Sequence, residues 1–295
     1  MVLVTGANGF LGRNLTKSLK TPFETLGRSN ATYEVDLSKH SPHLDTPPDV
    51  VLHLAGKAHS TPKTAEEAQA FFDVNLQGTK NLVSSLEALE RLPKAVIFAS
   101  TVAVYGLEEG VNISEDHPLN GATPYAKSKL EAEAFLEAWG KANSVTIGIL
   151  RLPLIVGPNP PGNLGAMVKG IRKGRYFRIG AGDTRKSVVL AEDIVGILPK
   201  LMETGGIYNL TDGHHPSFAE LETTICEQLG KGPPLTLPLA AAQLLGKVGN
   251  VVPGFPVNSS TIQKMTSDLT FDDSRARALL DWQPRRAIDH FFLTC

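Results

Sequence analysis

Tyr125 and Lys129 carry the chemistry that the sequence predicts most directly. Pro124 suits the first turn of a helix, and residues four apart on a helix share one face, so the phenol and the ammonium should lie together. Tyrosine normally keeps its proton near neutral pH, and a neighbouring ammonium stabilises the phenolate. Such a tyrosine can take a proton from a sugar or alcohol oxygen, or give one to it. Thr101 could donate a hydrogen bond to that same oxygen.

A Tyr-x-x-x-Lys pair arises by chance roughly 0.3 times in a chain with this many tyrosines and lysines, so the motif needs context. The alternative is an ordinary pair on a surface helix. The pair follows a glycine-rich loop and a strand that ends in Ser100 and Thr101. This order favours proton transfer by Tyr125 beside a nicotinamide that carries the hydride.

Gly6, Gly9 and Gly12 form the glycine-rich loop, between an apolar N-terminal run and a helix expected over 13–20. The spacing provides one glycine for a tight turn, one for the close approach of a pyrophosphate and one for packing the helix on the strand. Free backbone N–H groups and the helix dipole favour an anion there. We predict a dinucleotide site; the alternative is a tight strand–helix turn without a ligand.

Arg28 follows an expected strand over 23–26, and Asp36 lies at the end of the next expected strand, over 33–37. The end of the second strand of a dinucleotide fold meets the adenosine ribose, and an arginine there can pair with the 2′-phosphate of NADP. A solvated loop arginine is the alternative. The Asp36 carboxylate could accept from the adenine amino group, or it could simply cap a helix. His53 lies between leucines and is predicted to be a core residue, whereas Asn75 needs a polar partner in a loop or the cofactor.

Strands and helices alternate through the first half of the chain, with further strands expected over 48–56, 94–100 and 144–152 and a helical pattern over 64–89. This predicts an α/β fold with a doubly wound parallel sheet. Composition changes after Gly157. We expect a dinucleotide-binding domain over 1–157, to which 187–212 returns, and a smaller substrate-binding domain over 158–186 and 213–295. In the smaller domain, Ser217 and Glu220 form a capping-box pattern.

Composition narrows the class of protein. The chain has 29 Lys and Arg and 30 Asp and Glu, which argues against nucleic-acid or membrane-surface binding driven by overall charge. Its two cysteines form no disulfide framework, and the N-terminus becomes a strand without a basic segment, so a cytoplasmic location is expected. No apolar stretch reaches membrane-spanning length. His214 and His215 have no companions at ligand spacing, so no metal is predicted.

Over nearly its full length the sequence resembles the extended short-chain dehydrogenases/reductases, the nucleotide-sugar epimerase/dehydratase/reductase family. The matching segments are 5–12, 53–56, 75–79, 100–106, 125–129, 150–153 and 282–284. By that resemblance Thr101, Tyr125 and Lys129 are catalytic, Tyr105 and Gly106 are structural, and the protein is a homodimer that pairs through helices 64–89 and 125–141.

The resemblance also implies which residues bind the ligands. The cofactor positions, with Arg28 added from its place in the chain, are Gly6, Asn8, Gly9, Phe10, Leu11, Arg28, Asp36, Leu37, Leu54, Ala55, Gly56, Asn75, Ser100, Tyr125 and Lys129. The positions for a nucleotide-diphosphate sugar are Lys57, Thr101, Asn163, Arg185 and Lys186. Binding a diphosphate requires positive side chains that face its two phosphates, and Arg185 and Lys186 could supply them. The alternative is that both residues belong to a solvated basic loop without a ligand.

Three departures from the family pattern bear on the reaction. Val102 and Ala103 stand where dehydratases of the family carry Asp-Glu, which disfavours dehydration. Residues 152–155 lack the asparagine common in epimerases, and Arg28 favours NADP over NAD. These departures slightly favour reduction of a 4-keto nucleotide sugar, and segments 151–154 and 185–187 resemble bacterial reductases of surface polysaccharide assembly. The alternatives are a 4-epimerase with tightly bound NAD, a reductase of a non-nucleotide ketone and a non-catalytic dinucleotide-binding protein.

Overall fold

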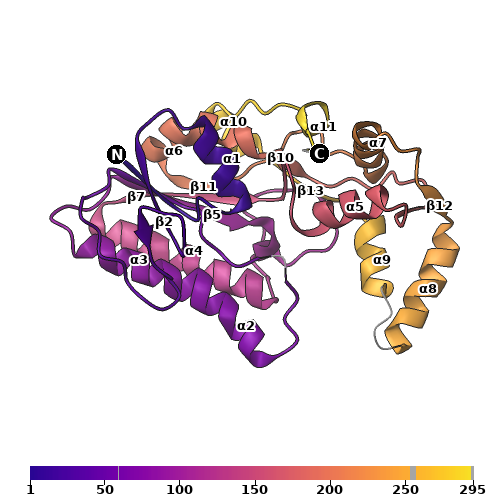
Figure 1. Cartoon of the computed structure of the whole chain (residues 1–295), viewed down its shortest axis with the longest axis horizontal. Helices are drawn as coiled ribbons and strands as arrows, with labels where there is room; N and C mark the ends of the chain where they lie inside the picture. Colours follow the sequence, from indigo (N-terminus) through magenta and orange to yellow (C-terminus); the bar gives the residue numbers. More distant parts are fainter. Residues whose placement is uncertain (59, 253–256, 294–295) are drawn as a thin grey trace.

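A seven-stranded parallel sheet runs through the N-terminal two thirds of the chain (Figure 1). The computed structural model describes residues 1–58, 60–252 and 257–293. Its strand order is β11-β7-β5-β4-β1-β2-β3, and every neighbouring pair is parallel. The strands are β1 (Val2–Thr5), β2 (Phe23–Gly27), β3 (Tyr33–Glu34), β4 (Val50–His53), β5 (Ala95–Thr101), β7 (Thr146–Leu152) and β11 (Gly206–Asn209).

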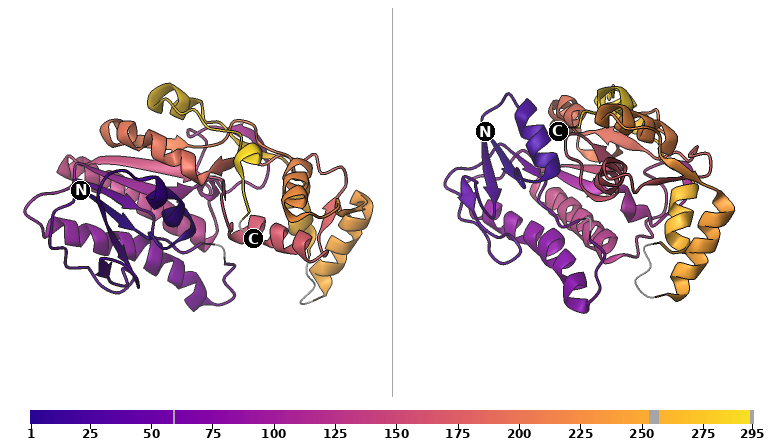
Figure 2. Two further views of the ribbon diagram at one scale, coloured as in Figure 1. Left: turned by 45° about the horizontal axis from the view of Figure 1, so that its top comes forward. Right: turned by 45° about the vertical axis from the view of Figure 1, so that its right-hand side comes forward.

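Helices cover both faces of this sheet because its central strands are apolar on both sides. In β5 every residue is buried, so alternate side chains feed two separate cores. One face carries α1 (Phe10–Ser18), α6 (Leu198–Thr204) and α10 (Ser274–Leu280). The other carries α2 (Ala65–Phe72), α3 (Gly78–Glu87) and α4 (Pro124–Asn143), as Figures 1 and 2 show. The doubly wound α/β fold predicted from the sequence is confirmed.

The chain reverses its direction across the sheet between β1 and β4, because β2 and β3 lie on one side of β1 and the later strands lie beyond β4. Open α/β sheets bind ligands at such a switch point, beyond the carboxyl ends of the strands. The glycine-rich loop follows β1 there, and residues 54–56 follow β4. The fold therefore brings these two segments together at the predicted dinucleotide site.

Contacts between backbones explain two of the three glycines. Gly6 has a φ of +69°, and a Cβ built on it would lie 2.7 Å from the Cα and N of Ala55. A Cβ on Gly12 would lie 2.7 Å from the Cα of Ala7. Gly9 is exposed at the N-cap of α1, where a Cβ would meet only the Gly6 oxygen, at 3.1 Å. Gly9 is thus the glycine with space in front of it.

The helical pattern over 64–89 is not one regular helix. Residues Asp73–Gln77 form a π-helical turn between α2 and α3. Wide turns of this kind often mark functional sites, and periodicity alone could not reveal one. The turn contains the buried residue Asn75. Its backbone carbonyl oxygen accepts a hydrogen bond from the Thr79 hydroxyl at 2.6 Å. A 3₁₀ segment, Ala191–Ile197, likewise precedes α6.

The C-terminal part of the chain packs around a separate apolar core (Figure 2). β11 returns to the central sheet, whereas β10 pairs with β8 in a two-stranded sheet. The predicted capping box at Ser217 and Glu220 is present on α7. The elements of this part are β8 (Leu154–Val156), α5 (Gly162–Arg172), β9 (Phe177–Ile179), β10 (Val188–Leu190), α7 (Phe218–Leu229), β12 (Leu235–Leu237), α8 (Leu239–Val251), α9 (Ser259–Thr266), β13 (Leu269–Phe271) and α11 (Ala287–His290), with β6 (Gly110–Ile113) pairing with β13.

The lengths of the helices and the state of the cysteines bear on the class of protein. The helices that the structure describes are too short or too polar to cross a lipid bilayer. Cys226 is a buried free thiol, and Cys295 lies outside the described residues.

Gly12→Ala should destabilise the fold by about 1–3 kcal/mol, because the new methyl group overlaps the Ala7 backbone and α1 must move away from β1. Urea unfolding measures the loss. Gly232→Ala is the matched control, since a Cβ there meets nothing within 4 Å. Equal stability of the two variants would contradict the backbone contact.

Candidate active site

Thr101 and Tyr125 lie together at the carboxyl end of β5. Thr101 ends that strand and is 8% exposed, and its hydroxyl also accepts from the Ala103 N–H at 3.2 Å. Tyr125 stands in the first turn of α4, which Thr123 caps. Burial raises the pKa of Tyr125, and a hydrogen bond with Thr101 acts in the opposite direction. The phenol therefore keeps its proton at neutral pH in this structure.

Lys129 lies one turn further along α4 and is buried. Its Nζ donates to the carbonyl oxygen of Ala99 at 2.7 Å and lies 4.1 Å from the centroid of the Phe98 ring. A Cβ on Gly56 would stand 3.4 Å from this nitrogen, so the residues after β4 cover the ammonium. Burial lowers the pKa of Lys129 to about 7, while the charge of Glu133 acts against this shift.

Glu133 and Arg151 form a buried ion pair behind Lys129 that the sequence analysis missed. Arg151 Nη2 donates to Glu133 Oε2 at 2.8 Å, and each side chain is 3% exposed. Arg151 Nη1 also donates to the Tyr105 hydroxyl at 3.2 Å, which agrees with a structural role for Tyr105. Two signals were available: Glu133 follows Lys129 by four residues on one helix, and Arg151 interrupts an apolar strand.

Ser100 belongs to this buried network. Its hydroxyl donates to Glu133 Oε1, and the side chain is 5% exposed. The structure thus places the Ser100 hydroxyl on Glu133, and the residue positions the network behind Lys129. Its assignment as a cofactor-binding residue stays a prediction.

Asn75 fastens the loop after β4 to α4. Its Oδ1 accepts from the Lys57 N–H at 2.7 Å, while its Nδ2 donates to the Lys57 carbonyl at 3.1 Å and to the Ser128 hydroxyl at 2.9 Å. The sequence predicted that Asn75 binds either a neighbouring loop or the cofactor, and in the structure it binds the loop that carries Lys57. Lys57 Nζ lies 5.3 Å from the centre of the Phe71 ring, which also neighbours Tyr125.

His53 is a core residue, as expected. Its Nδ1 lies 2.7 Å from the Thr5 hydroxyl and its Nε2 2.9 Å from that of Thr79. Burial lowers the pKa of His53 to about 3, so the ring is neutral. The side chain connects β4 to Thr5 of β1 and Thr79 of α3.

The residues predicted to meet the adenosine lie around the glycine-rich loop. Asn8 Nδ2 donates to the carbonyl oxygens of Ser29 at 2.7 Å and Asn30 at 3.2 Å, which ties the loop to the exposed turn that carries Arg28. Asp36 Oδ1 accepts from both the N–H and the hydroxyl of Ser38, and the hydroxyl bond lowers the pKa of Asp36. The hydrogen bonds of Asp36 close a turn over residues 36–39, and no helix begins there, so the helix-capping alternative for Asp36 is wrong.

Other cofactor positions line the same edge. Leu37 is buried, and its carbonyl accepts from Asn81 Nδ2 at 2.7 Å. The Ala55 N–H donates to the Thr5 hydroxyl, which fixes the residues after β4 against Gly6. Phe10 and Leu11 open α1, and a Cβ on Gly157 would lie 3.2 Å from the Phe10 ring.

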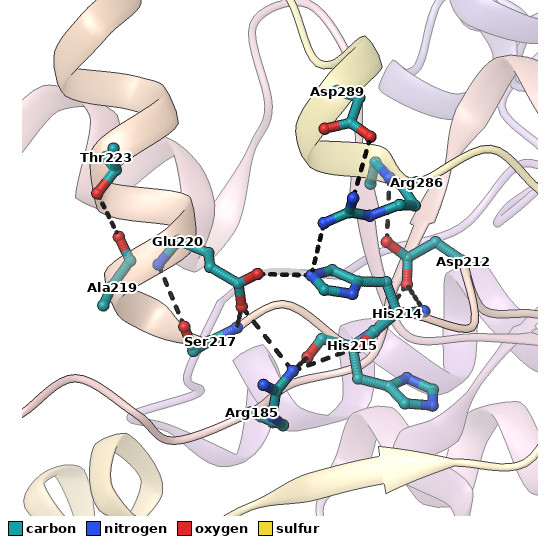
Figure 3. Close-up of polar contacts among 11 residues, drawn as sticks. Arg185, Asp212, His214, His215, Ser217, Ala219, Glu220, Thr223, Arg286 and Asp289 are labelled. Atoms are coloured by element: carbon teal, nitrogen blue, oxygen red, sulfur yellow. Dashed lines mark hydrogen bonds and ion pairs between the residues drawn. The ribbon is translucent and has the colours of Figure 1, made fainter.

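The predicted diphosphate residues point in different directions. Arg185 Nη1 donates to the His215 carbonyl at 3.0 Å and lies 3.8 Å from Glu220, within the polar cluster of Figure 3. Lys186 Nζ donates to the Ser267 carbonyl at 2.8 Å, and burial lowers the pKa of Lys186. Asn163 is exposed in the first turn of α5. The structure thus separates the side chains of Arg185 and Lys186.

His214 has a structural partner within the described part of the chain. Its Nε2 lies 2.6 Å from Glu220 Oε1 and 3.3 Å from Arg286 Nη2, as Figure 3 shows. Among the described residues no three His, Cys, Asp or Glu side chains converge as metal ligands.

Comparison with known proteins shows which family the sequence matches and which solved structures resemble the fold. The model of the NAD dependent epimerase/dehydratase family matches residues 2–211. A UDP-glucose 4-epimerase of Vibrio cholerae is 27% identical over 99% of this chain and 93% of its own length. A GDP-6-deoxy-D-mannose reductase of Pseudomonas aeruginosa is 27% identical over 75% of this chain and 77% of its own. Among solved structures, RMD from Pseudomonas aeruginosa complexed with NADPH superposes with a TM-score of 0.74 at 21% identity, over 97% of this chain and 94% of that one.

Replacing Lys129 with methionine should change how the free energy of unfolding depends on pH, because the variant lacks the buried titratable group. The folded chain holds the Lys129 pKa at about 7, whereas an unfolded lysine titrates near roughly 10.4. Between these values the unfolded chain binds the extra proton. Wild-type stability therefore falls as the pH decreases from ~10 to ~7, by at most about 1.4 kcal/mol per pH unit, and then levels off.

The variant lacks this dependence, so its stability relative to wild type should rise as the pH falls from 9 to 7 and stay constant from 7 to 6. Urea unfolding at pH 6, 7, 8 and 9 measures the difference. Lys127→Met, which replaces an exposed lysine of the same helix, is the control. A difference that stays constant from pH 6 to 9 would refute the lowered pKa.

Proposed function

The chain belongs to the NAD dependent epimerase/dehydratase family, and on this premise we propose that it is an NADPH-dependent reductase acting at C4 of a 4-keto nucleotide-diphosphate sugar. The observation that carries the proposal is the hydrogen bond between Thr101 and Tyr125 at the carboxyl end of β5, with the buried Lys129 one turn further along α4. The reductase relative and the structural neighbour that holds NADPH support the same direction.

The residues around the glycine-rich loop fit a dinucleotide. Gly9 is exposed at the N-terminus of α1, where a pyrophosphate would bind, while Gly6 packs against the backbone after β4 and Gly12 against the loop's own backbone. Both hydrogen bonds from Ser38 end on Asp36 Oδ1, so Oδ2 can accept from an adenine amino group. Arg28, on the turn held by Asn8, would pair with a 2′-phosphate.

Tyr125 is the proton donor of the proposed reduction. A bound nicotinamide supplies the hydride to the carbonyl carbon. Tyr125 gives its proton to the C4 oxygen, and Thr101 donates a hydrogen bond to the same oxygen as negative charge develops there. The raised pKa of Tyr125 keeps the proton available at neutral pH. Lys129, in its ammonium form, stabilises the tyrosinate that remains.

The residues proposed to bind the substrate come from two parts of the chain, the loop after β4 and the C-terminal part. Lys57 stands on the loop that Asn75 fastens, and Asn163 and Lys186 come from the C-terminal part. We assign the diphosphate to Asn163 first, because it is exposed, whereas Arg185 and Lys186 are both held by backbone carbonyls and would have to exchange these bonds. The 3₁₀ turn Val102–Tyr105 offers no carboxylate for the removal of water, which supports reduction over dehydration.

A 4-epimerase with retained NAD is the second candidate, favoured by the match to a UDP-glucose 4-epimerase along 99% of this chain. The two reactions use the same tyrosine and differ in what happens to the reduced cofactor. A protein purified with bound NAD that interconverts UDP-glucose and UDP-galactose without added cofactor would select the epimerase. Homodimer formation through α2, α3 and α4 is expected for both candidates.

Tyr125→Phe should lower kcat by about 10²–10⁴-fold, because the proton donor is removed while the ring that packs near Phe71 remains. The assay follows NADPH oxidation with UDP-, GDP- and dTDP-linked 4-keto sugars. NADPH affinity should stay unchanged. Tyr33→Phe, which removes a hydroxyl bonded to Glu24 at the sheet edge, is the control. Undiminished turnover by Tyr125→Phe would end the assignment.

Arg28→Ala should weaken NADPH binding by about 10–100-fold and leave NADH binding unchanged, since a charge-assisted contact to phosphate is worth about 1.5–3 kcal/mol. Fluorescence titration with each cofactor measures both constants. Arg91→Ala, which removes an exposed arginine paired with Asp49, should change neither. Equal effects of Arg28→Ala on NADPH and NADH would remove the argument for NADP.

A further inference from the structure

Helix α8 has its small and large residues on opposite faces. Ala242 and Gly246 are buried against α9, where a Cβ on Gly246 would lie 3.1 Å from Ile262 and 3.2 Å from the Ser259 backbone. An amphipathic helix normally turns its large apolar residues inward. Here the close-packed face holds the small residues, so the large ones must face elsewhere.

The large residues of α8 form an exposed stripe. Leu244, Val248 and Val251 recur at helical spacing and are 64%, 40% and 81% exposed. Further residues that share this exposure at or near the helix are Leu239, Leu245 and Val252. In Figure 1, α8 and α9 stand at the end of the molecule opposite β1, β2 and β3. Scattered exposed leucines need no explanation, but a continuous stripe does.

The stripe continues onto the short sheet of β9 and β12. Leu235 of β12 is the register partner of Phe177 of β9, and these side chains are 73% and 50% exposed. Gly180, after β9, would place a Cβ 3.9 Å from the Leu239 Cβ at the start of α8. We call the surface made by these residues, the α8 stripe and the C-terminal end of α5 the apolar–basic face.

Two segments of this region carry only positive charges, and two of these charges pair with acids from other segments: Arg178 with Glu222 and Lys264 with Glu108. Segments 157–182 and 231–267 together contain eight Lys and Arg and no Asp or Glu, in a chain whose total charge is −1. Lys169, Arg172, Lys173 and Arg175 are exposed at the end of α5 and before β9. Within the described ranges none of these four takes part in an ion pair. The charge balance of the whole chain conceals this local excess.

We propose that the apolar–basic face docks the protein on an anionic lipid surface. An exposed apolar helix face flanked by cations is the pattern that lies in the plane of a bilayer, with cations drawn to acidic headgroups. At thirteen residues α8 is too short to span, so it lies on the surface. A second copy of the chain fits less well, because a symmetric contact would bring two sets of like charges together. The proposal is independent of the reaction catalysed.

Vesicle sedimentation tests the proposal with the full-length protein. Wild type should sediment with vesicles of phosphatidylcholine and phosphatidylglycerol but not with phosphatidylcholine alone, and 0.5 M salt should weaken the binding. The variant Leu244→Ser/Val248→Ser/Val251→Ser should bind at least about tenfold less. The variant Arg172→Gln/Lys173→Gln/Arg175→Gln should lose most of its preference for anionic vesicles.

Controls separate docking from general stickiness and from misfolding. The variant Val111→Ser/Leu119→Ser/Leu279→Ser removes equally exposed apolar residues elsewhere and should bind like wild type. Unchanged urea unfolding of the stripe variant shows that it is folded. Wild type that stays in the supernatant, or a folded stripe variant that binds as well as wild type, would overturn the proposal. So would a wild-type dimer, measured by light scattering, that the stripe variant alone dissociates without vesicle binding.

Discussion

Burial of the Lys129 ammonium is the constraint on which the candidate site depends. An ammonium taken out of water loses much of its hydration, and the structure replaces it with the Ala99 carbonyl, the Phe98 ring and the nearby charge of Glu133. Glu133 also balances Arg151, so one carboxylate compensates two cations. That arrangement leaves the Lys129 pKa low and makes an additional negative charge nearby favourable. The tyrosinate formed in the proposed reaction is such a charge.

Residue types and spacing were enough to predict the groups that we propose to contact the ligands. Gly12 needs its small size for a contact with Ala7 in the same loop, and Tyr125 and Lys129 lie one turn apart on one helix, so local sequence contains this information. Gly6 instead packs against Ala55 of a distant segment. The parallel sheet followed from apolar runs such as β5, which are buried on both sides. Local signals therefore predicted the fold and the order of the site residues.

The supporting network could not be predicted in the same way. Arg151 and Glu133 meet only because β7 lies beside β5 under α4, and Asn75 reaches Lys57 and Ser128 only because the helix widens into a π turn. These contacts join residues from 18 to 53 positions apart. Helical periodicity over 64–89 contained no sign of the widened turn. Sequence spacing predicted the proposed reacting groups, whereas only the tertiary structure shows what orients them.

Averages over the whole chain hid the most unusual surface of the molecule. A total charge of −1 suggests a neutral exterior, yet segments 157–182 and 231–267, the second of which contains the exposed stripe of α8, hold eight Lys and Arg and no Asp or Glu. The need for small residues at close backbone contacts applies both to the glycine-rich loop near the N-terminus and to helix α8. Where a close contact is needed, as at Gly12 or Gly246, a small residue lets two backbones approach. On α8 that choice turns the leucines and valines outward, so dense packing on one face of the helix creates an apolar surface on the other.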